Sequence, residues 1–124
     1  MISVLIISES RYLVSREKIR QAIKSLLISE RLDDVEVSIS IVGARKIRKL
    51  NNQWRQIDKE TDVLSFPLEE ARDATDGVLR LGDIVVCYPV AIKQAQTENK
   101  LVDDKINELV EHGLRHLLGQ HHEE

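Results

Sequence analysis

The spacing of hydrophobic and polar residues along the chain predicts four strands. Residues 2–8 contain an unbroken apolar run, which indicates a buried strand. Between Val35 and Ile41, apolar residues alternate with polar ones, so we expect a strand with one buried face. Two further apolar runs predict short strands, one at residues 63–66 that Pro67 ends and one at residues 81–87.

Two segments with a helical period separate the first three strands. Ser15 can cap a helix, because apolar residues follow it at intervals of three and four up to about Ser29. A second helix follows Gly43 and has Trp54 on its apolar side. We therefore expect Trp54 to lie in the core rather than to form a platform on which bases stack.

Two more helices follow the last strand. Pro89 suits the first turn of a helix that runs to about Asn99. The last helix opens at Asp103 or Asp104, and Gly119 suits its C-terminal stop. Between the third and fourth strands, residues 69–80 are polar and predict a mobile loop or hairpin tip.

The predicted order is strand, helix, strand, helix, strand, strand, helix, helix. This order indicates an α/β or α+β fold, with about four strands in a central sheet packed by helices. A length of 124 residues suits one domain, which we expect to span residues 1–124. The last helix then carries the histidines of the chain.

Composition restricts the class of protein. Aromatic residues make up 3% of the chain, so the core must be aliphatic. The single cysteine, Cys87, excludes an intramolecular disulfide and a cysteine zinc site, and we expect it to be a small core residue. No apolar run is long enough for a signal peptide or a membrane span, which indicates a soluble cytoplasmic protein without a membrane partner. The net charge of −3 argues weakly against nucleic acid.

All four histidines lie between residues 112 and 122, in a pattern typical of a metal site. His112 and His116 are separated by four residues, so a helix projects both from one face. Gly119 permits a sharp reversal, because glycine enters the left-handed region at little cost. His122 can then return to the same ion as a third ligand. His121 is the alternative third ligand, although the spacing favours His122.

Three imidazoles suit one Zn²⁺ ion and leave a fourth position for water. Water bound to zinc loses a proton near neutral pH and becomes a nucleophile. The pattern therefore predicts a metal-dependent hydrolase that needs no small-molecule cofactor. Metalloproteases of this spacing have a glutamate base after the first histidine, where this chain has Gly113, so peptide hydrolysis is disfavoured. The alternative is a set of surface histidines near the end of the chain.

Three blocks of sequence resemble the YbeY family of bacterial endoribonucleases. The segment HGLRHLLGQHH, residues 112–122, matches the family signature H-G-x-L-H-L-x-G-x-D-H at its three ligand histidines and both glycines. Leu50-Asn51, Trp54-Arg55 and the run TDVLSFP at residues 61–67 resemble a second block, and LGDI at residues 81–84 resembles a third. The chain departs from the signature at Arg115 and His121.

The resemblance implies a central mixed sheet and a zinc-like ion on His112, His116 and His122. It also implies cleavage of single-stranded RNA, in processing of the small-subunit ribosomal RNA and in ribosome quality control. The expected partners are therefore ribosomal RNA and the small ribosomal subunit. The family's functional arginine corresponds to Arg55, which we expect to act with His116 in catalysis.

Cationic residues near Arg55 give a locally positive segment in an acidic chain. Arg55 can pair with two phosphate oxygens and stabilise the charge that develops there. The cationic residues of this segment either bind along an RNA backbone or form a solvated helix face. They are Arg45, Lys46, Arg48, Lys49, Arg55 and Lys59, and Asp58 is the acidic residue among them.

Several nearby residues have more than one interpretation. Thr61, Asp62 and Ser65 either line a cleft beside the metal or form a turn and a strand. Asp83, inside an apolar strand, is expected to be a structural hydrogen-bond partner.

Two alternatives to a metal-dependent endoribonuclease stay open at the level of sequence. The first is a non-catalytic ribosome-assembly factor whose metal is structural. The second is a metallohydrolase of another substrate, such as a peptide, against which Gly113 weighs.

Overall fold

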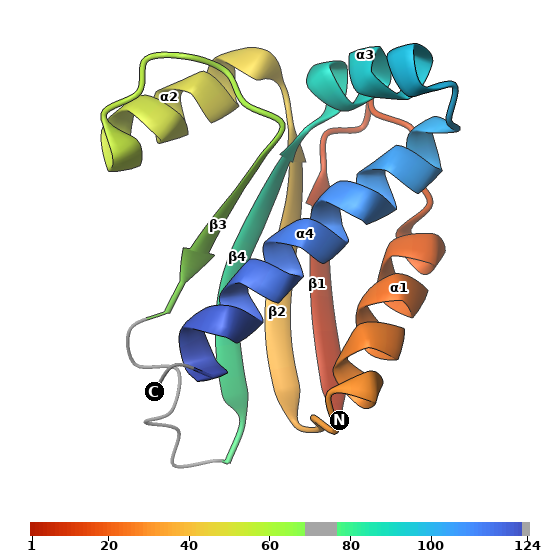
Figure 1. The fold of residues 1–124 in the computed structure, drawn as a ribbon, viewed down its shortest axis with the longest axis vertical. Coiled ribbons are helices and arrows are strands. Elements are labelled where there is room, and N and C mark those ends of the chain that lie inside the picture. Colours follow the sequence, from red (N-terminus) through yellow and green to blue (C-terminus); the bar gives the residue numbers. More distant parts are fainter. Residues whose placement is uncertain (69–76, 123–124) are drawn as a thin grey trace.

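The computed structural model describes residues 1–68 and 77–122, with side chains described as far as residue 119. Its centre is a four-stranded sheet in the order β1-β2-β4-β3 (Figure 1). The strands β1, β2 and β4 are parallel, whereas β3 is antiparallel to β4, so the predicted mixed sheet is confirmed. The strands are β1 (Ile2–Ser8), β2 (Val35–Val42), β3 (Val63–Pro67) and β4 (Leu79–Cys87).

The predicted order of strands and helices is also confirmed, with helices α1 (Arg16–Ser29), α2 (Ala44–Arg55), α3 (Tyr88–Glu98) and α4 (Val102–His122). Ser15 caps α1, since its side chain accepts a hydrogen bond from the backbone N–H of Lys18. Asn99 ends α3 in the left-handed conformation, with φ of 57°.

Two hydrophobic clusters lie on opposite faces of the sheet. Ile84 and Val86 of β4 belong to the larger cluster, to which α1 and α4 contribute. Val85 and Cys87 belong to a smaller cluster with Ile47 of α2. Because successive side chains of a strand point to opposite faces, α2 packs on the face opposite to α4. In Figure 1, α1 and α4 run side by side across one face of the sheet.

The second face is covered incompletely. Leu5 and Ile7 on β1 alternate with the buried Ile6, and they are 57% and 56% exposed. Cys87 is fully buried in the cluster under α2, as predicted, and this burial raises the pKa of its thiol above the ordinary value. The face of the sheet opposite to α4 is therefore exposed at β1 and well packed under α2.

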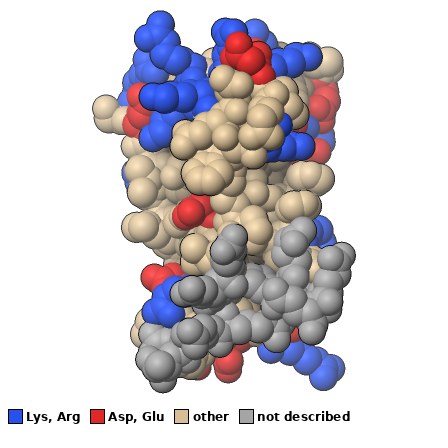
Figure 2. All heavy atoms as spheres, turned by 90° about the vertical axis from the view of Figure 1, so that its left-hand side faces the viewer, with Lys and Arg blue, Asp and Glu red and all other residues tan. Residues whose placement is uncertain are grey.

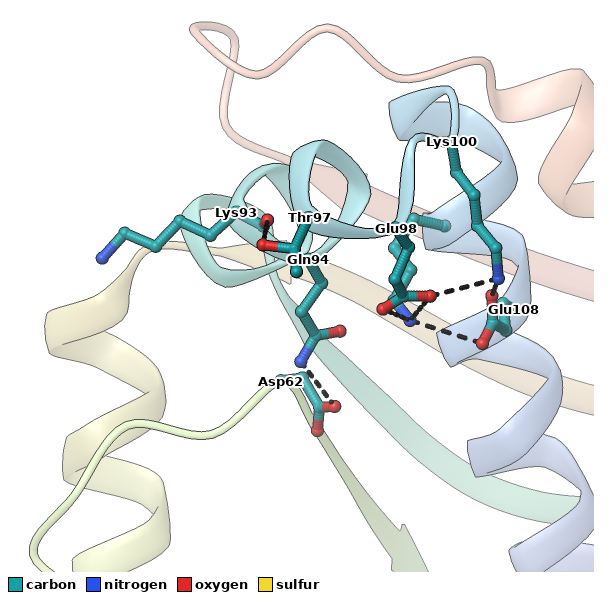
Figure 3. Close-up of polar contacts among 8 residues, drawn as sticks. Asp62, Lys93, Gln94, Thr97, Glu98, Lys100 and Glu108 are labelled. Carbon is teal, nitrogen blue, oxygen red and sulfur yellow. Dashed lines mark hydrogen bonds and ion pairs between the residues drawn. The ribbon is translucent and has the colours of Figure 1, made fainter.

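Charged residues hold the start of α4 against the end of α3 (Figure 3). Lys105 is only 5% exposed, and its ammonium group lies 2.9 Å from Glu98 and 3.3 Å from Glu108. Lys100 donates to Glu108 over 2.6 Å. The hydrogen bond from Lys105 lowers the pKa of Glu98, and the bond from Lys100 lowers that of Glu108. Both carboxylates thus stay ionised, and the nearly buried Lys105 keeps two anionic partners.

The prediction that Gly119 ends the last helix is wrong, because α4 continues to His122. A glycine inside a helix costs only about 1 kcal/mol relative to alanine. Leu117 and Leu118 are buried just before it, and their packing holds this turn of the helix against the sheet.

The prediction that Trp54 lies in the core is also wrong, since its side chain is 61% exposed. Ile47 and Asn51, on the same side of α2, are buried. In Figure 1 the end of α2 lies beyond β3, at the edge of the sheet. The position of the helix over the sheet, rather than its period, therefore exposes Trp54.

The connection between β3 and β4 falls partly outside the described residues. Of the polar segment predicted at residues 69–80, residues 69–76 lie outside the described part, while Leu79 and Arg80 belong to β4. Asp83 accepts a hydrogen bond from Ser38 of the neighbouring strand, which supports the structural role predicted for it.

A substitution at Gly82 tests the close contact between β4 and β3. It has φ of +134°, and a Cβ atom there would overlap the carbonyl oxygen of Phe66 on β3. We expect Gly82→Ala to lower the free energy of unfolding by about 2–4 kcal/mol, measured by urea denaturation. Gly77→Ala is the matched control, since Gly77 also has a positive φ but a Cβ atom there would meet nothing within 4 Å. An equal loss in both variants would show that strain, not the contact with β3, matters at Gly82.

Candidate active site

The two described histidines of the candidate site lie on the exposed flank of α4. Gly113, Leu114 and Leu117 form the buried side of the same helix turns. His112 and His116, one turn apart, are both exposed. The helix also contacts β3, so this flank borders the edge strand of the sheet. The predicted pairing of two imidazoles on one helix face is therefore present.

Ser65 of β3 joins this flank to the sheet. Its Oγ lies 3.0 Å from Nδ1 of His116, at hydrogen-bond distance. The contact orients the imidazole ring and leaves Nε2 as the nitrogen that can bind a cation. Histidine ligands of metals commonly use their other ring nitrogen in this way. Of the two interpretations of Ser65, the structure thus favours the one that places it beside the histidines.

Gly113 allows α4 to lie close to the sheet. A Cβ atom at this position would come within 2.8 Å of Cγ2 of Ile84 on β4. The backbone of α4 therefore approaches the sheet more closely than a larger side chain permits. A glutamate base cannot occupy this buried position, which agrees with the inference that the usual route of peptide hydrolysis is not available.

The predicted third metal ligand lies outside the part of the structure in which side chains are described. This holds for His122 and equally for the alternative ligand, His121. Among the described residues, no group of three His, Cys, Asp or Glu side chains could hold an ion. The pair His112 and His116 nevertheless fits the donor set of zinc, since both are imidazoles at helical spacing.

Asp62 has a structural role at the start of β3 (Figure 3). Its carboxylate accepts from the backbone N–H of Val63 over 2.7 Å and from Nε2 of Gln94 over 3.2 Å. Its carbonyl oxygen accepts from the N–H of Cys87 over 2.8 Å. These bonds hold β3 in register and thereby position Ser65. Gln94 was not predicted from the sequence, because nothing distinguishes it from other polar residues of an ordinary amphipathic helix.

Arg55 is separated from the histidines. It is the last residue of α2 and is exposed, and α2 packs on the face of the sheet opposite to α4. The structure therefore does not bring Arg55 into direct contact with His112 or His116.

The cationic segment is only partly neutralised. Arg48 forms an ion pair with Asp58 at 2.8 Å, and the hydrogen bond from Arg48 lowers the pKa of Asp58. Lys46 and Lys49, by contrast, line a cavity over the open face of the sheet. Part of the cationic segment, including Lys46 and Lys49, therefore faces the open side of the molecule.

Comparison with known proteins identifies the family. A sequence model of Endoribonuclease YbeY matches residues 6–124, nearly the whole chain. The chain belongs to the YbeY family. Endoribonuclease YbeY of Cellvibrio japonicus is 40% identical over 121 residues, which cover 98% of this chain and 67% of that protein. Endoribonuclease YbeY of Persephonella marina is 37% identical over 110 residues, covering 89% of this chain and 71% of that protein.

Other relatives differ more in length. The protein of the same name from Myxococcus xanthus is 41% identical over 100 residues, but the match spans only 34% of its length. The solution structure of TM1509 from Thermotoga maritima matches with a TM-score of 0.60 and 28% identity, covering 94% of this chain and 71% of that one. The fold and the family are thus supported independently. No described helix is long and apolar enough to cross a membrane.

Ser65 offers a test of the site that needs no metal. We expect Ser65→Ala to change the tautomer ratio of His116, measured by ¹⁵N NMR of the metal-free protein, because the partner of Nδ1 is lost. The free energy of unfolding should fall by about 0.5–1 kcal/mol. Ser65→Thr keeps the hydroxyl group and serves as the control. An unchanged tautomer ratio in Ser65→Ala would contradict the role given to this hydrogen bond.

Proposed function

We propose that this chain is a metal-dependent endoribonuclease that cleaves single-stranded RNA during maturation of small-subunit ribosomal RNA and in ribosome quality control, acting in the cytoplasm. The observation that carries the proposal is the pair His112 and His116 on one helix, with Ser65 at hydrogen-bond distance from His116, in a chain of the YbeY family. The metallohydrolase domain comprises residues 1–124. Its partners are ribosomal RNA and the small ribosomal subunit.

The proposed metal is a single Zn²⁺ held by His112, His116 and His122 and by one water. When bound, such an ion supplies a water molecule of lowered pKa and polarises a phosphoryl oxygen. A regular helix turns by about 240° over six residues, so it does not bring position 122 onto the face of His116. Zinc binding therefore requires the last turn of α4 to open at Gly119.

Residues of the chain itself then bind and orient the substrate. Ser65 holds the ring of His116, and the polar contacts of Asp62 hold the strand that carries Ser65. Arg55 pairs with phosphate oxygens and stabilises the negative charge that grows on them during cleavage. Because Arg55 lies across the edge from the histidines, this role requires Arg55 to approach the phosphate beside His116 when RNA is bound.

The catalytic assignment is tested with three variants and a short single-stranded ribosomal RNA. We expect His116→Ala and Arg55→Ala each to lose about a hundredfold or more in kcat/KM, because each removes charge stabilisation or its support. Lys24→Ala, an exposed cation on α1, is the control and should cleave normally. Cleavage should also stop when a chelator removes the metal.

Retention of full activity by both His116→Ala and Arg55→Ala would refute the catalytic assignment. Binding of the small subunit without any cleavage by the wild-type protein would instead favour a non-catalytic assembly factor. Metal-dependent turnover of a peptide would favour the other alternative, a metallohydrolase of another substrate.

Gly119 tests the proposed opening of α4, because one substitution should have two opposite effects. Gly119→Ala should raise the stability of the metal-free protein by about 1 kcal/mol, since alanine favours the helix. It should also disfavour the left-handed turn by about 1–2 kcal/mol. The two effects together predict a zinc affinity roughly thirtyfold or more below that of wild type, measured by competition with a chelating dye. His112→Ala is the comparison, since it should weaken zinc binding without the gain in stability. Unchanged zinc affinity in Gly119→Ala would contradict the opening.

A further inference from the structure

The exposed Trp54 at the end of α2 packs on the half-buried Phe66 of β3, on the face of the sheet opposite to the histidines. Trp54 is 61% exposed, and its ring centre lies 6.3 Å from that of Phe66 on β3, with an angle of 61° between the planes. This edge contact holds the indole in place but covers little of its surface. The indole therefore offers a ring face on which a nucleobase can stack.

A cavity of about 550 Å³ adjoins this pair. Its wall combines aromatic and aliphatic side chains with one cation and one carboxylate: Trp54, Phe66, Leu68, Lys46 and Asp83 take part. A space of this size, largely apolar but with a few polar groups, suits a small planar ligand. A single nucleobase has that chemistry.

A second cavity of about 1110 Å³ continues from the first under α2. The two share four lining residues, among them Ser40 and Lys46, so they form one groove over the open face of the sheet. Arg45 and Lys49 line the second cavity with Lys46. Figure 2, which views the β3 edge, shows Lys and Arg side chains gathered over α2 and mostly uncharged surface below them.

We propose that this groove is a substrate subsite, in which one unpaired base of single-stranded RNA stacks on Trp54 while the adjoining phosphates lie along the cations of α2. Stacking platforms next to cationic grooves are the common means of binding single strands. The cations that line the groove match phosphates better than they match an apolar peptide. The inference deepens the proposed endoribonuclease function and rests on it for its effect on cleavage.

The subsite and the histidines are connected through β3. Ser65 and Phe66 are neighbours in this strand, and their side chains therefore point to opposite faces of the sheet. Ser65 contacts His116 on one face, while Phe66 contacts Trp54 on the other. Because β3 is the edge strand, an RNA chain can pass around it. One base is then anchored on Trp54, and the phosphodiester to be cleaved lies beside the histidines.

Asp83 gives this subsite a preference among bases. A carboxylate repels phosphates, so the part of the groove beside Asp83 suits a base rather than a phosphate. Asp83 already accepts a hydrogen bond from Ser38 and can accept a second from a base amino group. Carboxylates accept hydrogen bonds from N4 of cytosine, whereas uracil offers no amino group. The subsite therefore favours cytosine over uracil.

Binding is measured first, without metal and without cleavage. Trp54 is the only tryptophan of the chain, so RNA bound at the subsite should quench the intrinsic fluorescence. The probe is an oligocytidylate of about ten nucleotides, and fluorescence anisotropy of a labelled copy gives Kd for every variant. Trp54→Ala should raise Kd by about 5- to 100-fold, the range that one stacked base contributes. Trp54→Phe should restore much of the affinity.

The control is Leu101→Ala, which removes another large apolar side chain that is 69% exposed but lies at the turn before α4. Its Kd should equal that of wild type. Equal Kd values for Trp54→Ala and wild type, or the absence of fluorescence quenching, would overturn the subsite. Quenching by an apolar peptide but not by the oligocytidylate would overturn it in favour of a protein partner.

A cleavage assay separates this inference from the proposed function. If wild type cleaves single-stranded RNA, Trp54→Ala should raise KM and leave kcat nearly unchanged. If wild type does not cleave RNA but binds it through Trp54, the endoribonuclease proposal is refuted and the RNA-binding site at Trp54 is supported. The base preference is tested with oligouridylate: wild type should bind it more weakly than oligocytidylate, and Asp83→Asn should reduce that difference. Equal affinity of wild type for both would refute the role of Asp83.

Discussion

The arrangement of the site depends on the close approach of α4 to the sheet. Gly113 faces Ile84, and a Cβ atom at position 113 would lie only 2.8 Å from that side chain. Leu114 and Leu117 are fully buried beside this contact, so the helix is held along its length by aliphatic packing. The exposed flank of α4 consequently lies next to β3, where Ser65 meets His116. A helix displaced outward by a larger residue at position 113 would lose that hydrogen bond.

The edge strand β3 contributes side chains to both the histidine site and the proposed subsite at Trp54. Its side chains alternate between the two faces of the sheet, so Ser65 contacts His116 on one face and Phe66 contacts Trp54 on the other. The contacts of Asp62 hold the beginning of the strand, and the positive φ of Gly82 on β4 lets the two strands lie together. Both the metal proposal and the subsite proposal therefore depend on one short strand at the edge of the sheet.

Local patterns predicted most of the elements, and tertiary context explains where those predictions were wrong. Alternation in β2 and the cap at Ser15 depend on neighbours in sequence, and both predictions are confirmed. Trp54 follows the apolar period of α2, but exposure depends on where the helix ends relative to the sheet. Gly119 has the character of a helix stop, but packing of the preceding leucines outweighs its small cost. The partner of Ser65 is 51 residues away and has no local signal.

The sequence by itself determined the family, the order of strands and helices, and the pair His112 and His116, because these follow from residue type and short spacings. Only the tertiary structure decided that Ser65 orients His116, that Gly113 is required by Ile84, and that Arg55 and Trp54 lie across the β3 edge from the histidines. These relations join segments distant in the chain. They exist because α2 and α4 pack on opposite faces of one sheet. The hydrophobic period of a helix does not predict on which face of a sheet the helix will pack.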